Sequence, residues 1–225
     1  MQMPPLRSIT SVQVLVMLVA ILIWKVTVSI VWEYRNYVPP NFESDFLFGR
    51  ESYFWNGYHG AFYVHLLAGP PSLMLGTVLI SQSLRRRSFA WHRRLGRVQV
   101  ALVLLMIAPS GLWMACYAAT GAVAGVGLGL LALATATCAW CGWRSAVARR
   151  LEAHRRWMWR TFLLLCSAVV LRILGGLATV LQWDAAWLYS ASIWTSWLVP
   201  LLVFEISSSS SSLVKKRTLP SNITA

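Results

Sequence analysis

Acidic residues are scarce in this sequence, and so are charged residues of either sign. Asp and Glu number 7 against 20 Lys and Arg, and charged residues make up 12% of the chain, while hydrophobic residues make up 57%. Soluble globular domains usually carry about 25% charged residues and about 45–50% apolar residues. The composition therefore excludes an ordinary soluble domain and indicates a membrane protein.

Common enzyme and disulfide signatures are also missing. We find no glycine-rich phosphate loop, no cluster of zinc ligands, and no serine or cysteine nucleophile spaced from a base in a recognisable pattern. All four cysteines lie in apolar stretches, where a thiol behaves as a small apolar side chain, so no disulfide framework is predicted. They are Cys116, Cys138, Cys141 and Cys166.

Long apolar runs are what the sequence does contain. A bilayer core takes about 20 apolar residues per helix, and windows of that length begin and end at about residues 12–32, 59–80, 98–119, 121–142, 157–181 and 187–206. Continuous runs indicate helices, because the strands of a barrel would alternate apolar and polar residues. The predicted fold is all-α, a polytopic bundle of six transmembrane helices over residues 12–206, with an aromatic outer loop at 33–58.

Basic residues are concentrated in alternate connections between these runs. Because short loops rich in Lys and Arg face the cytoplasm, we expect an N-in, C-in membrane protein. Residues 1–11 then form a cytoplasmic N-terminus and residues 207–225 a disordered basic cytoplasmic tail. This placement excludes a nucleic-acid partner and predicts the bilayer and its anionic headgroups as partners.

Two similar strings stand before apolar runs, "AWHRRLGR" at Ala90–Arg97 and "AHRRWMWR" at Ala153–Arg160. In a haem b site, two histidines ligate the iron while arginines pair with the propionates. The strings therefore allow one haem b, with His92 and His154 as iron ligands. The arginines of this predicted cofactor site are Arg93, Arg155 and Arg160.

An alternative interpretation is that both strings only anchor the chain, through lipid phosphate and helix packing. One haem is expected rather than two, because His59 and His65 lie six residues apart on one predicted helix and point to different faces. Glu205, near the inner end of the last run, is expected to pair with one of the loop arginines.

A second candidate site lies in the predicted outer half of the bilayer. Lys25, His65 and Arg172 fall at similar depth there, and a charge at that depth costs at least ~2.5 kcal/mol unless it finds a cavity or a partner. They are predicted to share a substrate pocket. The alternative is that Lys25 snorkels to the surface and Arg172 pairs with backbone carbonyls or Asp184.

Several ordered strings carry a resemblance to a known family. They are "HLLAGPPSLMLG" from His65, "HRRLGR" from His92, "SGLWMA" from Ser110, "HRRWMWRTFLLLCSAVVLR" from His154, and "WLVPLLVFE" from Trp197. From about residue 59 to 205, the chain resembles bacterial membrane proteins of the domain of unknown function 2306 family. It departs from the family pattern at Thr77, where a proline usually follows the glycine. The resemblance implies an uncharacterised multi-pass protein of the bacterial plasma (inner) membrane.

Three functions stay open. The first is a cytochrome-b-like electron-transfer protein with haem at the paired histidines. The second is a protein that binds or transports a small anionic solute or a lipid headgroup. The third is a non-catalytic subunit of a membrane complex, with a membrane-protein partner or a second copy of itself.

Overall fold

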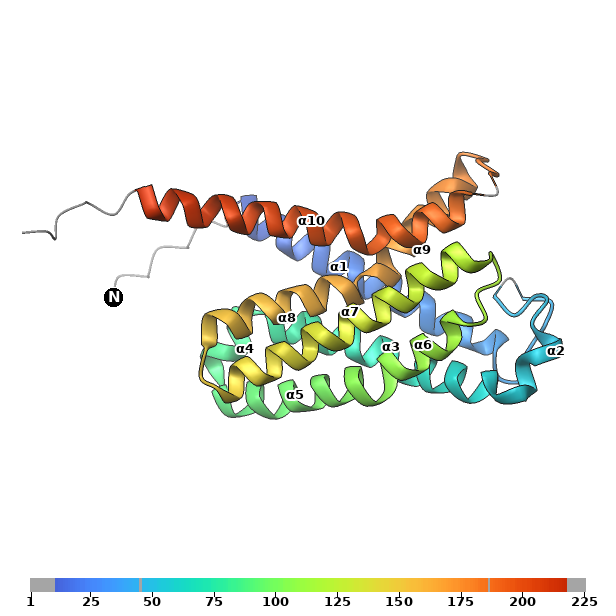
Figure 1. The fold of residues 1–225 in the computed structure, drawn as a ribbon, viewed down its shortest axis with the longest axis horizontal. Coiled ribbons are helices and arrows are strands. Elements are labelled where there is room, and N and C mark those ends of the chain that lie inside the picture. Colours follow the sequence, from blue (N-terminus) through green and yellow to red (C-terminus); the bar gives the residue numbers. More distant parts are fainter. Residues whose placement is uncertain (1–10, 45, 186, 218–225) are drawn as a thin grey trace, which may run out of the picture. The chain divides into compact units, whose positions relative to one another are not determined.

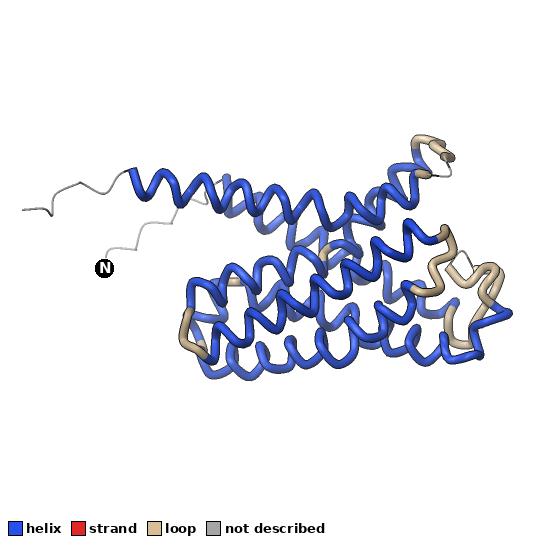
Figure 2. Tube along the Cα trace, in the orientation of Figure 1, coloured by secondary structure: helices blue, strands red, loops and turns tan. Residues whose placement is uncertain are grey.

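The structure is a computed structural model that describes residues 11–44, 46–185 and 187–217. Every regular element in that part of the chain is helical (Figure 2). Six helical segments are long and apolar enough to cross a bilayer: Val16–Asn36, Glu51–Ile80, Phe89–Ala115, Ala122–Val147, Leu151–Val180 and Leu188–Ser209. The predicted all-α fold with six membrane-spanning segments is confirmed.

The chain divides into two compact units, Met1–Ser52 and Tyr53–Ala225. The first contains α1 (Ser11–Trp32), the short 3-10 helix η1 (Glu33–Asn36) and a series of turns in which Leu47 is fully buried. Side chains hydrogen bond with the backbone inside this unit. Thr27 donates to the carbonyl of Ile23 at 2.7 Å, and Arg50 Nε donates to the carbonyl of Phe46 at 2.7 Å.

The second unit is built around a bundle of four helical rods. Its rods are α3 (His59–Ile80), the continuous rod formed by α5 (Phe89–Ala101), η3 (Leu102–Ile107) and α6 (Ala108–Ala115), then α7 (Ala122–Val147) and α8 (Leu151–Leu165). The helices α5 and α8 each pack on both α3 and α7, and they run on opposite sides of the bundle (Figure 1). Side chains from α5 and α8 can therefore meet in the bundle interior.

Two further helices follow the bundle. A break at Cys166 separates α8 from α9 (Ser167–Val180), and α9 packs on α8 and on α10 (Leu188–Arg217). The helix α10 also packs on α7, where Trp194 Nε1 donates to the carbonyl of Val123 at 3.2 Å. It continues past residue 206 to Arg217, whereas residues 218–225 of the predicted tail and residues 1–10 lie outside the described residues.

Close helix contacts in the bundle depend on glycine. The sequence places Gly121, Gly125 and Gly129 on one strip, and in the structure Gly121 caps α7 with a φ of +90°. A Cβ on Gly125 would lie 2.8 Å from the carbonyl oxygen of Ala115 in α6, and one on Gly129 would meet only side chains at 3.7 Å or more. Glycine at 125 therefore lets α6 and α7 approach backbone to backbone.

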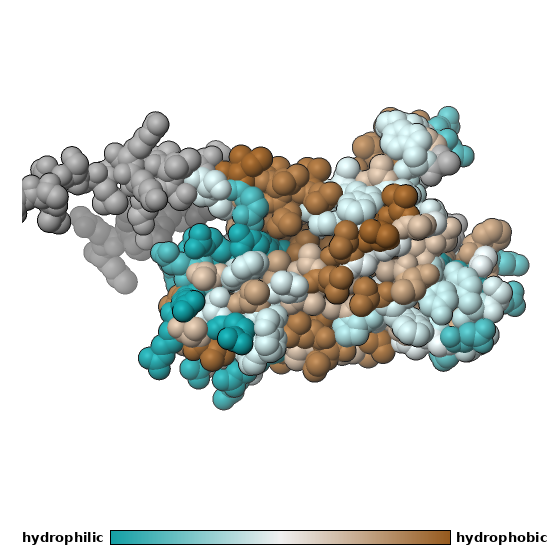
Figure 3. All heavy atoms as spheres, in the orientation of Figure 1, coloured by the Kyte–Doolittle hydropathy of each residue, from teal (hydrophilic) through white to brown (hydrophobic). Residues whose placement is uncertain are grey.

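The two ends of the bundle differ in chemistry. One end, which we call the arginine-rich end, comprises residues 82–97 and 144–160, that is α4 (Gln82–Arg87), the starts of α5 and α8 and the end of α7. Hydrophilic side chains gather there in Figure 3. The opposite end, the aromatic end, holds the ring pairs Tyr53–Tyr117 and Tyr58–Phe62. The two ends therefore offer separate candidate sites.

Candidate functional site

His154 is held at the arginine-rich end by the backbone of a neighbouring helix. Its Nδ1 lies 2.8 Å from the carbonyl oxygen of Gly142 in α7. Since a carbonyl only accepts hydrogen bonds, Nδ1 is the donor, and Nε2 is the ring nitrogen left available to a ligand. A Cβ at 142 would lie 2.7 Å from Met158 Sδ, so a larger residue there would displace the methionine side chain. A backbone carbonyl on Nδ1 is the usual partner that fixes the orientation of a metal-binding histidine.

His92 comes from α5, on the opposite side of the bundle. Its ring lies against Phe89 with centroids 6.5 Å apart, and its Nδ1 is buried with no hydrogen-bond partner among the described residues. His92 and His154 stand near the starts of α5 and α8, which pack on the same two helices, α3 and α7. The predicted pair is thus brought to the same end of the bundle from two opposite helices.

The arginines of the predicted cofactor site are arranged differently from one another. Arg93 is exposed, and its guanidinium lies 5.7 Å from the ring of Phe89, which also contacts His92. Arg155 is exposed at the start of α8. These two cations lie at the arginine-rich end of the bundle, where they are available to pair with an anionic group bound next to the histidines.

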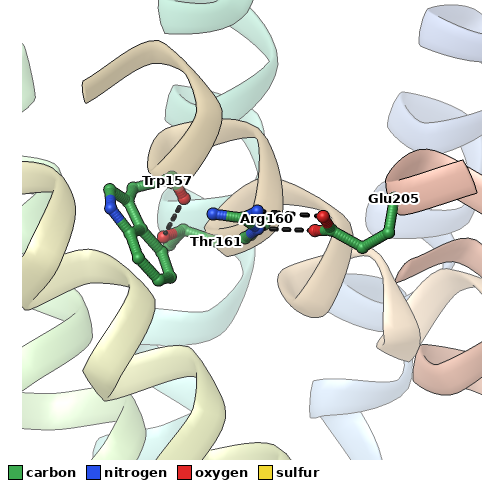
Figure 4. Close-up of polar contacts among 4 residues, drawn as sticks. All are labelled: Trp157, Arg160, Thr161 and Glu205. Carbon is green, nitrogen blue, oxygen red and sulfur yellow. Dashed lines mark hydrogen bonds and ion pairs between the residues drawn. The ribbon is translucent and has the colours of Figure 1, made fainter. Parts of the chain in front are cut away.

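Arg160 is already paired. Its Nε and Nη2 donate to the two carboxylate oxygens of Glu205 at 2.6 and 2.9 Å, and the guanidinium lies 4.4 Å from the ring of Trp157 (Figure 4). The expected pairing of Glu205 with a loop arginine is therefore seen, with α8 and α10 as the helices it joins. Two of the donors of Arg160 are thereby engaged within the protein.

The three residues of the second predicted site belong to three different helices. His65 lies in α3 with Nδ1 3.0 Å from the hydroxyl of Ser110, which itself donates to the carbonyl of Met106 at 2.5 Å. Arg172 is exposed on α9, and Lys25 is exposed on α1 in the first unit. The structure brings His65 together with Ser110, and the shared pocket with Arg172 and Lys25 stays a prediction.

A polar pair in the middle of the bundle was missed by sequence reasoning. Gln99 in α5 is 2% exposed, and its Nε2 donates to the hydroxyl of Ser72 in α3 at 3.0 Å, while its Oε1 has no partner. One signal was available in the sequence. Gln99 stands seven residues, or two helical turns, after His92, so both lie on one face of α5.

The paired histidines offer too few protein ligands for a bare metal ion. Within the described residues, no group of three or more His, Cys, Asp or Glu side chains is placed to hold a metal. Structural and catalytic zinc sites use three or four protein ligands. Haem iron requires only axial ligands from the protein, and histidine is a common one. The two histidines of α5 and α8 match the number of axial ligands that haem iron takes from a protein, and the haem itself stays a prediction.

Residues 62–207 match the model of a family described as "Predicted membrane protein (DUF2306)". The match runs from α3 into α10 and covers more than half of the chain, so the chain belongs to this family, as its sequence motifs indicated. No curated protein and no solved structure matches the chain.

Proposed function

We propose that this membrane protein transfers electrons through one haem b held at the arginine-rich end of the bundle, with His92 and His154 as the axial ligands. The observation that carries the proposal is that α5 and α8 pack on the same two helices, α3 and α7, and bring both histidines to one end of the bundle. In α-helical bundles, cofactor sites are built in the core from side chains on facing helices.

The state of the two imidazoles supports the same proposal. The Gly142 carbonyl leaves His154 Nε2 free for a ligand, and the buried Nδ1 of the His92 ring has no hydrogen-bond partner in the described part of the chain. A buried polar atom without a partner costs about 1–3 kcal/mol, so the apo arrangement is unfavourable unless something else binds there. When bound, haem would supply one-electron chemistry, with a potential tuned by its axial ligands and their hydrogen bonds.

The remaining roles fall to groups at the same end. Arg93 and Arg155 are the cations available for the propionates, because guanidinium pairs well with carboxylates. Arg160, engaged with Glu205, would instead keep α10 docked on α8. The carbonyl of Gly142 orients His154, and the ring of Phe89 packs against His92.

Absorption spectroscopy tests this proposal directly. Protein purified from haem-replete cells is expected to show a Soret band and a positive pyridine haemochrome assay. His92→Leu and His154→Leu are each expected to abolish or shift the band. The matched control is His59→Gln, because His59 lies at the aromatic end and contacts the carbonyl of Phe54. A folded wild-type protein without haem, or a spectrum indifferent to both histidine variants, would refute the proposal.

We also propose that the arginine-rich end contacts anionic lipid headgroups on the cytoplasmic face of a bacterial plasma membrane. Exposed arginines there stack on aromatic rings, as Arg94 does on Trp91 at 5.6 Å, which combines a cation with an interfacial ring. Native mass spectrometry from nanodiscs containing equal phosphatidylglycerol and phosphatidylcholine is expected to retain the anionic lipid preferentially. Equal retention of both lipids would overturn this assignment.

A further inference from the structure

The middle of the bundle contains a polar pair that the proposed function does not use. Ser72 is 0% exposed and Gln99 2% exposed, and the only hydrogen bond between them runs from Gln99 Nε2 to Ser72 Oγ at 3.0 Å. The other end of the carboxamide, Oε1, is buried without a partner in the described chain. A third hydrogen-bonding group is therefore missing from this site.

Exchanging the oxygen and nitrogen positions of the Gln99 carboxamide does not give both of its ends a hydrogen-bond partner. A serine hydroxyl can accept from an amide nitrogen or donate to an amide oxygen, so Ser72 can serve only one end of Gln99 at a time. The other end stays unpaired in either orientation. Because a buried unpaired polar atom costs about 1–3 kcal/mol, the site favours a small molecule that can hydrogen bond with it.

The helix α5 also leaves room beside this pair. His92, Gly96, Gln99 and Val103 fall on one stripe of α5, at intervals of three and four residues. At Gly96, between the histidine and the glutamine, a Cβ would meet no atom within 4 Å. Near Gln99 itself, a Cβ on Gly76 would lie 3.7 Å from Nε2 and 2.9 Å from the ring of Phe162. On the α8 side, the ring of Phe162 therefore fills the space next to Gly76, whereas space is open beside Gly96 on α5.

His92 provides the other end of this stripe. Its Nδ1 is the second buried atom of α5 without a partner. Seven residues of α-helix span roughly 10 Å, and hydrogen-bonded oxygens lie about 2.8 Å apart. Two or three water molecules would therefore connect His92 Nδ1 with Gln99 Oε1, passing Gly96.

We propose that α5 lines a narrow file of water that enters at the arginine-rich end beside His92 and ends at the Ser72–Gln99 pair. Water satisfies Oε1 of Gln99 and Nδ1 of His92, because it both donates and accepts hydrogen bonds. The file makes the centre of the bundle accessible to protons from the arginine-rich end. Val103, 0% exposed in an apolar cluster with Ala68, Ile107 and Ala139, lies one turn beyond and closes it.

Cysteine reactivity tests for this water. Thiols react as thiolates, which form in water and not in an apolar core, so a cysteine on the file is modified and a cysteine beyond it is not. The experiment uses full-length protein in detergent with the four native cysteines replaced by alanine. Gln99→Cys and Val103→Cys are treated with the small neutral reagent methyl methanethiosulfonate and followed by intact mass.

Gln99→Cys is expected to react at least about 10-fold faster than Val103→Cys, with both variants eluting as the parent does in size-exclusion chromatography. Gly96→Cys serves as a second reporter, since its side chain has room and the variant does not remove the polar pair. It is expected to react at least as fast as Gln99→Cys. Equal rates at 99 and 103, or an unreactive Gly96→Cys in a folded protein, would overturn the proposal. None of these readouts depends on haem content.

Discussion

The ion pair between Arg160 and Glu205 gives the sharpest prediction of stability. It is bidentate, with N–O distances of 2.6 and 2.9 Å, and the side chains are 22% and 40% exposed. Hydrogen bonds to charged groups contribute about 1.5–3 kcal/mol each, whereas fully exposed ion pairs contribute roughly 0–1 kcal/mol. The partial exposure places the pair between these limits, at about 2 kcal/mol of coupling.

Removing one partner should cost more than the coupling alone. Glu205→Gln leaves the Arg160 cation without its counter-charge in a membrane helix, where an unpaired charge costs at least ~2.5 kcal/mol if it cannot reach water. Arg160→Met also removes the contact with Trp157 at 4.4 Å, which contributes roughly 0.5–2 kcal/mol. The expected order of stability is wild type, then Glu205→Gln, then Arg160→Met.

A double-mutant cycle separates this pair from general effects of substitution. Unfolding by sodium dodecyl sulfate from mixed micelles, followed by tryptophan fluorescence, measures each free energy. The variant with both Arg160→Met and Glu205→Gln should lose about 2 kcal/mol less than the sum of the two single changes. Arg155→Met, at an exposed arginine of the same helix, should change stability by no more than about 0.5 kcal/mol. Additive losses in the cycle would refute the interaction.

Other substitutions and one labelling experiment test the rest of the fold. Gly125→Ala should destabilise by about 1–3 kcal/mol, because its Cβ would meet the backbone of Ala115, whereas Gly129→Ala should be tolerated; similar midpoints of thermal unfolding for both would contradict this. Ser110→Ala should cost about 0.5–1.5 kcal/mol by removing its hydrogen bond with His65, and an unchanged unfolding midpoint would count against that contact. Cysteines placed in the α7–α8 turn should be labelled by an impermeant maleimide in inside-out vesicles and protected in intact cells; the reverse pattern would invert the predicted topology.

The membrane-spanning fold was predictable because apolar length alone identifies a spanning helix. The helix ends were not. The structure starts α5 at Phe89 and α8 at Leu151, whereas the apolar windows begin at 98 and 157. Arginines end an apolar window, but they do not end a helix, because arginine is a good helix former. The histidines at 92 and 154 therefore lie within helices that continue into the bundle.

The candidate sites were only partly predictable, for a different reason. The histidine pair could be found because both members stand in similar strings, and Glu205 could be matched with an arginine because acidic residues are rare in this chain. Ser72 and Gln99 are 27 residues apart on different helices. Their contact depends on how α3 packs on α5, and neither residue is charged, so no local pattern revealed them.

Unmatched polar atoms distinguish the two ends of the bundle as places for a ligand. At the aromatic end, His65 is bonded to Ser110, and His59 contacts a backbone carbonyl. The three buried side-chain atoms without partners in the described chain are His92 Nδ1, Gln99 Oε1 and Trp197 Nε1. Trp197 lies in an apolar cluster with α7 and α8 side chains, where its indole contributes apolar packing. The other two share one face of α5 and lead inward from the arginine-rich end, so a ligand that binds this half satisfies groups which the protein itself leaves unsatisfied.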